Sequence, residues 1–301
     1  MKLAITGGTG FVGARLLRLA FQQGHEVIAL TRRSQDEREG VTWIQGALDN
    51  RQALQRLVEH ADAVIHVAGV ISAPDAAGFE AGNVAGTLGL LAAATASGVH
   101  RFVHVSSLAA REPKLSLYGA SKARSEELVQ RSGLDWAIVR PPAVYGPGDR
   151  ETLELFKAAR LGLVPLPPKG RLSLIHVDDL SRLLLALAAE DAPSKLIVEP
   201  DDGRAGGWTH REFAAALAAS QDRRALALSV PASLLRLGAR IDGVLRGSKA
   251  KLTPDRAAYF SHPDWAIDPM RRPSPSLWKP QVPTPQGLAD TARWYGRQGW
   301  L

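Results

Sequence analysis

The sequence predicts an α/β protein built on a doubly wound parallel sheet, with a smaller C-terminal substrate region. Two observations carry this prediction. A strand-like segment, Lys2 to Thr6, runs into a glycine-rich turn and then into a helical pattern from Arg15 to Gln23. Strand-like and helix-like segments then alternate as far as Arg140, and such alternation requires parallel strands joined by right-handed crossovers.

The later elements follow from apolar periodicity and strand-forming composition. The expected strands cover 25–30, 41–45, 63–66, 101–105 and 136–140, and the expected helices cover 50–59, 83–97 and 118–131. Beyond Pro141 the order is less regular, and proline-rich breaks at 165–168 and 269–285 separate helical pieces. The chain shows no internal repeat.

The turn after the first strand has the composition of a pyrophosphate site. Gly7 can make a tight turn, Gly10 lets the backbone approach a phosphate, and Gly13 lets the following helix pack closely on the strand. The N-terminus of that helix then directs its partial positive charge at the anion. Because strand, glycines and helix come in the required order, we predict a dinucleotide site in this run, Gly7-Gly8-Thr9-Gly10-Phe11-Val12-Gly13.

The second strand ends in Thr31-Arg32-Arg33, where an NAD-binding protein usually carries an acidic residue for the ribose 2′-hydroxyl. An arginine can grip a 2′-phosphate with two hydrogen bonds and stack on adenine. The pair therefore favours NADP (NADPH) over NAD. The alternative is that both arginines are solvated loop charges in a basic protein.

Length and composition exclude several classes of function. The 301 residues are 45% hydrophobic and can bury a large core, and the absence of cysteine excludes disulfides, thiolate metal sites and cysteine nucleophiles. His100 and His104 fall in a turn and a strand, so we expect no metal site. The chain opens on a core strand and its longest apolar run, 86–99, is too short to span a bilayer, so we expect a cytoplasmic protein.

The net charge of +7 is concentrated between Gln221 and Arg256, where eight arginines and lysines oppose three aspartates. Within that segment, a helical pattern after Pro231 places leucines among arginines. It is interpreted either as a cap helix that packs its apolar face on the main domain, or as a surface for an amphipathic or anionic small-molecule substrate, with contact to a membrane surface left open. No basic face interleaved with aromatic residues indicates nucleic-acid binding.

Ser106 and Ser107 end the expected strand 101–105, and a helix begins eleven residues later with Tyr118-Gly119-Ala120-Ser121-Lys122. Tyr118 and Lys122 are four apart and share one face of a helix. An ammonium beside a phenol stabilises the phenolate and makes the tyrosine a usable acid or base. The alternative is a packing tyrosine and a solvated lysine, which the combination with Ser107 and the nucleotide fold disfavours.

Five segments together resemble the extended (atypical) short-chain dehydrogenase/reductase superfamily, of the NAD-dependent epimerase/dehydratase type with a Rossmann fold. The similarity extends through His176-Val177-Asp178-Asp179, and the motifs that carry it are Thr6 to Gly13, Asn83 to Thr87, Ser106-Ser107, Tyr118 to Lys122, and Arg140 to Gly148.

The resemblance implies roles for individual residues. Ser107 would orient the substrate oxygen, Tyr118 would be the catalytic acid/base, and Lys122 would hold the nicotinamide ribose. Asn83 would be a structural link to the central strands rather than a reactant. The cofactor would also contact the strand ends and loops around it, namely Leu48, Ala68, Gly69, Val70, Ser106, Pro141 and Val144. The cofactor domain would cover 1–165, with sheet contributions from about 171–200, and the substrate region mainly 166–301.

The chain departs from the pattern in two places. Ala47 stands where many members carry an acidic residue near the adenine, and the loop from Ser107 to Tyr118 is short compared with sugar-nucleotide epimerases. In style, the C-terminal half is closest to the branch of the complex I accessory subunit, some members of which reduce ketones on lipids.

Three functions are compatible with these observations. The favoured one is an NADP-dependent oxidoreductase that moves a hydride between nicotinamide and a carbonyl or secondary alcohol, including a lipid-like ketone, with Tyr118 transferring the proton. The alternatives are a nucleotide-sugar epimerase or dehydratase with a retained cofactor, and a non-catalytic NADPH-binding accessory protein. The sequence leaves the substrate and the oligomeric state open.

Overall fold

A computed structural model describes residues 1–167, 169–247 and 253–301, and the chain divides into two compact units. Unit 1 consists of Met1–Pro141, Leu180–Glu199 and Pro273–Lys279. Unit 2 consists of Pro142–Asp179, Pro200–Arg272 and Pro280–Leu301. The functional division into 1–165 and 166–301 remains a prediction.

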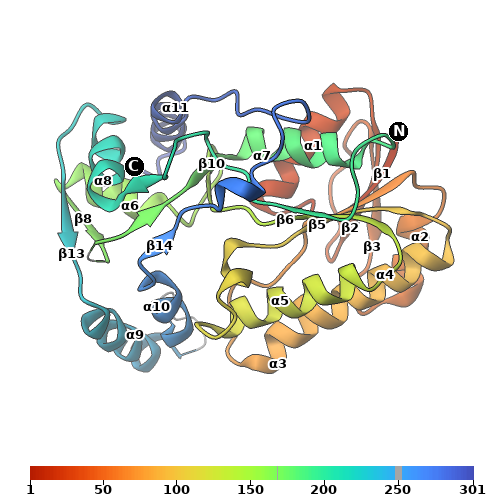
Figure 1. Ribbon diagram of the computed structural model, residues 1–301, viewed down its shortest axis with the longest axis horizontal. Helices are drawn as coiled ribbons and strands as arrows, with labels where there is room; N and C mark the ends of the chain where they lie inside the picture. Colours follow the sequence, from red (N-terminus) through yellow and green to blue (C-terminus); the bar gives the residue numbers. More distant parts are fainter. Residues whose placement is uncertain (168, 248–252) are drawn as a thin grey trace. The chain divides into compact units, whose positions relative to one another are not determined.

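Unit 1 contains a seven-stranded sheet whose paired strands are all parallel, which confirms the predicted fold class (Figure 1). The strand order is β11-β6-β5-β4-β1-β2-β3. After β3 the chain crosses to the other side of β1, so the carboxyl ends of β1 and β4 form the switch point where ligands bind in such sheets. The strands are β1 (Lys2–Thr6), β2 (Glu26–Thr31), β3 (Val41–Gln45), β4 (Ala63–His66), β5 (Arg101–Val105), β6 (Asp135–Val139) and β11 (Leu196–Val198).

Helices cover the sheet of unit 1. One core cluster joins Ala4, Val64 and Phe102 on one face of the sheet to apolar residues of α2 (Arg51–Val58), α4 (Gly86–Ala96) and α5 (Leu117–Gln130). The opposite face is covered by α1 (Phe11–Gln22) and by α7 (Val177–Ala188), whose residues from Leu180 on belong to unit 1 (Figure 1). Central strands covered on both faces read as continuous apolar runs, which is why short sequence windows were enough to predict them.

The predicted helix 83–97 differs from the observed element in its first turns. A short helix, α3 (Ala76–Phe79), continues as a π-helical segment, Glu80–Ala85, before α4 begins. The Thr87 hydroxyl donates to the Asn83 carbonyl at 2.6 Å, and the Asn83 side chain is turned inward. A wider turn of this kind places a side chain where a regular helix would not, and it recurs at functional sites. The loop before α5 also contains a 3-10 helix, Leu108–Arg111.

Unit 2 is built from short strands and helices around a second core. Buried residues of this core include Tyr145, Phe156, Trp208, Phe213 and Tyr295. The strands pair in small sheets: β7 (Ala143–Tyr145) with β10 (Leu174–His176), β8 (Leu163–Leu166) with β13 (Leu226–Ser229), and β9 (Arg171–Leu172) with β12 (Trp208–Thr209) and β14 (Asp264–Trp265). The helices are α6 (Leu153–Arg160), α8 (His210–Ala219), α9 (Ala232–Arg246), α10 (Pro254–Phe260), a 3-10 turn Pro269–Arg271 and α11 (Thr284–Arg297).

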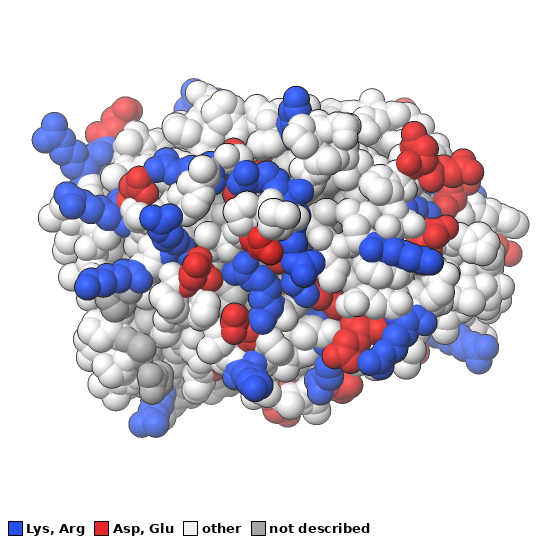
Figure 2. All heavy atoms as spheres, in the orientation of Figure 1, with Lys and Arg blue, Asp and Glu red and all other residues white. Residues whose placement is uncertain are grey.

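The basic segment 221–256 forms β13, α9 and the start of α10. Lys249 and Lys251 lie outside the described residues, as do the side chains of Arg236, Val244 and Leu245. On the face seen in Figure 2, basic and acidic side chains are interspersed among uncharged ones. The net charge of +7 is therefore not gathered into one stripe on that face.

Candidate active site

The glycine turn between β1 and α1 has the geometry of a phosphate-binding loop. Gly7 has a φ of 75°, and a Cβ there would lie 2.7 Å from the Ala68 nitrogen. A Cβ on Gly13 would lie 2.0 Å from the Gly7 carbonyl oxygen, so α1 could not pack on the turn with any larger residue. Gly10 is different, because it is exposed and a Cβ there would meet only the Gly7 oxygen, at 3.3 Å. The backbone at Gly10 is thus open to a ligand.

The start of α1 offers donors and a favourable field to an anion. Gly10 is the N-cap residue of this helix of 12 residues, no side chain caps it, and its first turn contains no acidic residue. Uncapped N–H groups at a helix N-terminus bind phosphate groups. Thr9 is exposed and Phe11 and Val12 are partly exposed beside them. The residues present therefore fit the pyrophosphate of a dinucleotide.

Arg32 and Arg33 follow the last residue of β2 and are exposed. The Thr31 hydroxyl donates to the Arg33 carbonyl at 2.7 Å and accepts from the Arg33 N–H at 3.3 Å, which holds the turn that presents both side chains. Within the described part of the chain, neither arginine forms an ion pair. Their charge is available to an anionic ligand group. Beyond β3, Leu48 packs on Gly86, where a Cβ would approach the Leu48 side chain to 2.7 Å.

The loop after β4 is held at the switch point by buried polar contacts. The Ala68 N–H donates to the Thr6 hydroxyl at 3.2 Å, which joins the ends of β1 and β4. The buried Asn83 side chain accepts from the Val70 N–H at 2.7 Å and donates to the Val70 carbonyl at 2.9 Å. Asn83 also donates to the Ser121 hydroxyl at 2.9 Å. It therefore connects this loop, with exposed Gly69, to α5.

Ser107, Tyr118 and Lys122 come together at the carboxyl end of β5. Ser116 caps α5 by accepting from the Gly119 N–H at 2.9 Å, and this starts the helix so that Tyr118 lies in its first turn. Ser107 is buried, Tyr118 is partly exposed, and the two side chains form a hydrogen bond. The Lys122 ammonium, one turn further, donates to the Val105 carbonyl at 2.8 Å.

The electrostatics of Tyr118 differ from the sequence-based expectation. Burial raises its pKa above the ordinary value of 10.0, and the hydrogen bond with Ser107 only partly opposes this effect. The net shift of the Tyr118 pKa is therefore upward, whereas the sequence predicted a lowering by Lys122. A tyrosine with a raised pKa stays protonated at neutral pH, so the phenol is present to donate a proton and the phenolate, the form that accepts one, is scarce.

Burial also shifts the pKa of Lys122, from 10.5 to about 8, although the nearby Glu126 carboxylate raises it. Two fully buried histidines lie in the same interior. His66 bonds Thr6 at 2.7 Å and Thr87 at 3.0 Å, and burial together with the Lys122 charge lowers its pKa to about 3. His104 bonds Ser125 at 3.0 Å, and its pKa is lowered for the same reasons. Both imidazole rings are therefore uncharged at neutral pH, and they fill the interior rather than act as acids.

The two remaining predicted residues, Pro141 and Val144, belong to different units. The Pro141 carbonyl accepts from the Leu108 N–H at 3.2 Å, next to Ser107. Val144 lies in β7 and pairs with Ile175 of β10 in unit 2. Among the described residues, no group of acidic and histidine side chains could hold a metal ion.

Comparison with known proteins identifies the family. Residues 3–198 match the NAD-dependent epimerase/dehydratase family. The chain belongs to this family. The ceramide reductase of Caulobacter vibrioides is 38% identical over 315 residues, which cover 99% of this chain and 96% of that protein. The 4-hydroxy-2-methyl-3-oxo-4-farnesyl-3,4-dihydroquinoline-1-oxide ketoreductase of Stigmatella aurantiaca is 32% identical over 67% of this chain and 69% of its own length.

A solved epimerase of the same fold gives the structural comparison. The UDP-glucuronic acid 4-epimerase of Bacillus cereus, solved with NAD, superposes with a TM-score of 0.76 at 17% identity, over 99% of each chain. This likeness concerns the fold alone. The family and its relatives make the chain an NAD(P)-dependent enzyme of the extended short-chain dehydrogenase/reductase type.

The relatives correct one expectation. The matched family, the two reductases and the solved epimerase give no support for a place in the branch of the complex I accessory subunit. A non-catalytic binding role, which rested on that branch, loses its basis because the chain is an enzyme.

A buried ionic network that sequence reasoning missed lies behind the site. Glu126, on α5 one turn after Lys122, accepts from Arg140 at 2.9 and 2.6 Å and from the Ser106 hydroxyl at 2.5 Å. Glu199 accepts from Arg140 at 3.4 Å and from Arg111 at 3.2 Å. Charge-assisted bonds of this kind fix the geometry of the groups they join. The spacing of four between Lys122 and Glu126 was the one sequence signal that could have indicated the network.

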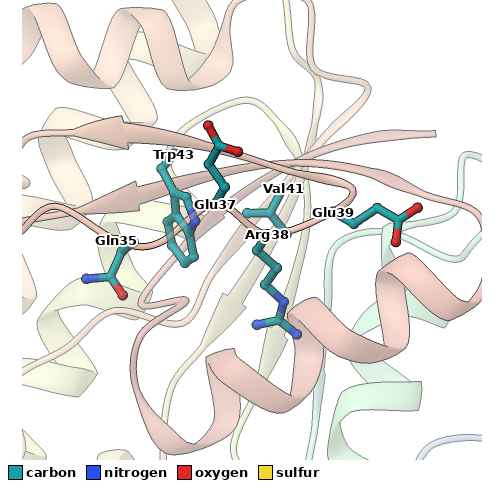
Figure 3. Close-up of a pocket in the computed structure, with 6 residues that line it drawn as sticks. All are labelled: Gln35, Glu37, Arg38, Glu39, Val41 and Trp43. Atoms are coloured by element: carbon teal, nitrogen blue, oxygen red, sulfur yellow. The ribbon is translucent and has the colours of Figure 1, made fainter.

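A hollow beside β3 is separate from this site. Figure 3 shows that its lining comes from β3 and from the segment before it, and none of the predicted site residues is part of it. The lining consists of Gln35, Glu37, Arg38, Glu39, Val41 and Trp43.

Proposed function

We propose that the protein is an NADP-dependent reductase that converts a lipid-like ketone to a secondary alcohol, with Tyr118 as the proton donor. The observation that carries the proposal is the arrangement of Ser107, Tyr118 and Lys122 at the end of β5 in a member of this family. The names of the two relatives support a ketone substrate of lipid character, since one is a ceramide reductase and the other reduces a farnesylated quinoline oxide.

The residues of unit 1 would hold the cofactor along the switch point. The glycine turn and the N-terminus of α1 would bind the pyrophosphate, and Arg32 and Arg33 would bind the 2′-phosphate, which selects NADP. Leu48, Ala68, Gly69 and Val70 would line the adenosine side, and Lys122 would hold the nicotinamide ribose. Ser106 and Pro141 would complete the nicotinamide end.

When bound, the reduced nicotinamide supplies the hydride that the carbonyl carbon of the substrate accepts. Ser107 donates a hydrogen bond to the carbonyl oxygen and orients it. Tyr118 transfers its phenolic proton to that oxygen as the C–O bond becomes that of an alcohol, and the phenolate is reprotonated from solvent. The raised pKa of Tyr118 keeps the phenol protonated at neutral pH, so the proton to be donated is in place at the start of each turnover.

The test is a screen of purified protein for NADPH consumption with long-chain ketones, steroids and nucleotide sugars. We expect oxidation of NADPH with a long-chain ketone and little with NADH. The Tyr118→Phe variant should bind NADPH as the wild type does and lose turnover, because only the proton donor is removed. Undiminished turnover in that variant would refute the role of Tyr118. Conversion of a nucleotide sugar without net NADPH consumption would instead identify an epimerase or dehydratase.

A further inference from the structure

Unit 2 exposes one face of a small sheet that is apolar. In the parallel pair of β8 and β13, Leu226 is in register with Leu163 and Leu228 with Pro165. Residues two apart on a strand share a face, so Leu163, Leu226 and Leu228 project together. Their exposed fractions run from 49% for Leu228 to 69% for Leu226. On the other face, Val164 is buried in the core of unit 2.

The helix that follows β13, α9, also exposes apolar side chains on one side. The Val230 N–H donates to the Leu166 carbonyl at 2.8 Å, and the chain then enters α9, as Figure 1 shows. Leu234, Leu237 and Ile241 are spaced by three and four residues and so lie on one side of α9. Each is more than half exposed, whereas Ala239 is fully buried. We use the name apolar surface for these two exposed groups together, namely Leu163, Leu226 and Leu228 of the sheet and Leu234, Leu237 and Ile241 of α9.

Basic side chains accompany the apolar surface. Arg160, Arg223 and Arg224 flank β8 and β13, and Arg240 lies on α9 beside Ile241. All four are exposed, and in the part of the chain that the structure describes they form no ion pair. In Figure 2, blue side chains separated by white surface lie along the left edge, where Figure 1 draws β13.

Apolar and basic side chains together indicate which partner the apolar surface binds. Exposed apolar side chains together with uncompensated arginines are the signature of a segment that lies in the interface of an anionic bilayer, with leucines in the acyl boundary and arginines at the headgroups. A second copy of the chain would bring arginines against arginines across a two-fold interface. Lipid phosphates neutralise the same charges.

We propose that the apolar surface docks the enzyme on an anionic lipid bilayer without crossing it. The inference rests on the proposed function in one respect, because a lipid-like ketone resides in a bilayer and has to be reached there. Among the described residues, every helix falls short of the length and apolarity that a bilayer span requires. The contact is therefore peripheral, and it is weakened by salt.

The test measures flotation of the full chain with vesicles of phosphatidylcholine, alone or mixed with phosphatidylglycerol. The wild type should bind the mixed vesicles, and high salt should release it. The double variants Leu226→Ser with Leu228→Ser and Leu234→Ser with Leu237→Ser should each bind roughly tenfold or more weakly, because apolar area is lost from the contact. Leu88→Ser, at an exposed leucine of α4, is the matched control and should bind like the wild type.

Several outcomes would overturn the docking. These are a wild type that does not float with anionic vesicles, double variants that float as well as it does, or a stable dimer in sedimentation that only the double variants lose. The last result would assign the apolar surface to a second copy of the chain.

A water-soluble short-chain ketone separates docking from catalysis. All variants should reduce it at the wild-type rate, since none of the substituted residues is among the predicted catalytic and cofactor-binding residues. A protein that floats with vesicles but reduces no ketone would refute the proposed function and leave the docking intact. A protein that reduces the soluble ketone but does not bind vesicles would refute the docking and leave the proposed function intact.

Discussion

Replacing Lys122 by methionine tests the buried ammonium at the centre of the site. Lys122 is 4% exposed, and burial lowers its pKa from 10.5 to about 8. Because one pKa unit corresponds to about 1.4 kcal/mol, keeping this side chain charged costs the folded state roughly 3 kcal/mol at neutral pH.

The sign of the pH dependence follows from proton binding. Between about pH 8 and 10.5 the unfolded chain keeps the Lys122 proton while the folded protein has lost it. The unfolded state then binds more protons, so the stability of the wild type rises with pH across this window. Below about pH 8, Lys122 is protonated in both the folded and the unfolded state, so the folded state bears the whole free-energy cost of the buried charge.

Methionine has a similar length and no charge, so Lys122→Met removes this cost. It also removes the hydrogen bond to the Val105 carbonyl, a loss of roughly 1 kcal/mol. At neutral pH the variant should therefore be more stable than the wild type by roughly 2 kcal/mol, and near pH 10.5 it should be less stable by roughly 1 kcal/mol. Turnover should be lost at both pH values.

The assay is chemical denaturation of wild type and variant, followed by circular dichroism at neutral and alkaline pH. Groups common to both proteins cancel in the difference between their free energies of unfolding. Lys114→Met, at an exposed lysine shortly before α5, is the matched control and should change stability little at either pH. A Lys122→Met protein that is less stable at neutral pH, or a difference that does not vary with pH, would refute this reasoning.

Three further predictions concern the cofactor and the ionic network. Arg32→Ala with Arg33→Ala should weaken NADPH binding roughly tenfold or more and leave NADH binding nearly unchanged in calorimetry, and equal losses would show that neither arginine reads the 2′-phosphate. Gly13→Ala should abolish the thermal stabilisation of the protein by NADPH, because its Cβ would lie 2.0 Å from the Gly7 oxygen. The control Gly296→Ala, whose Cβ has nothing within 4 Å, should keep that stabilisation. Stabilisation by NADPH in both variants would contradict the tight turn. Glu126→Gln should move the alkaline limb of the kcat/KM profile to lower pH, since the carboxylate raises the pKa of Lys122, and an unmoved limb would make Glu126 purely structural.

The sequence alone was enough to predict the elements that depend on neighbouring residues. Lys2–Thr6, Val41–Gln45, Ala63–His66 and Arg101–Val105 were predicted with the bounds that the structure has. Three of these strands have apolar interiors, and Val41–Gln45 carries β-branched and aromatic residues, so the signal for each strand is local. The glycine turn and the pair Tyr118 and Lys122 were equally readable, because a turn and a spacing of four are set by adjacent backbone.

Tertiary structure decided what depends on distant residues. Arg140 meets Glu126 and Glu199 across 14 and 59 positions of the sequence, and no periodicity relates such residues. The pKa of Tyr118 went up rather than down because burial, which comes from the packed chain, outweighed what the spacing to Lys122 suggested. The leucines of α9 were readable as a helical stripe, but only the folded chain shows that Leu234, Leu237 and Ile241 stay exposed. Periodicity determines which side chains share a face, whereas long-range packing determines whether that face is covered.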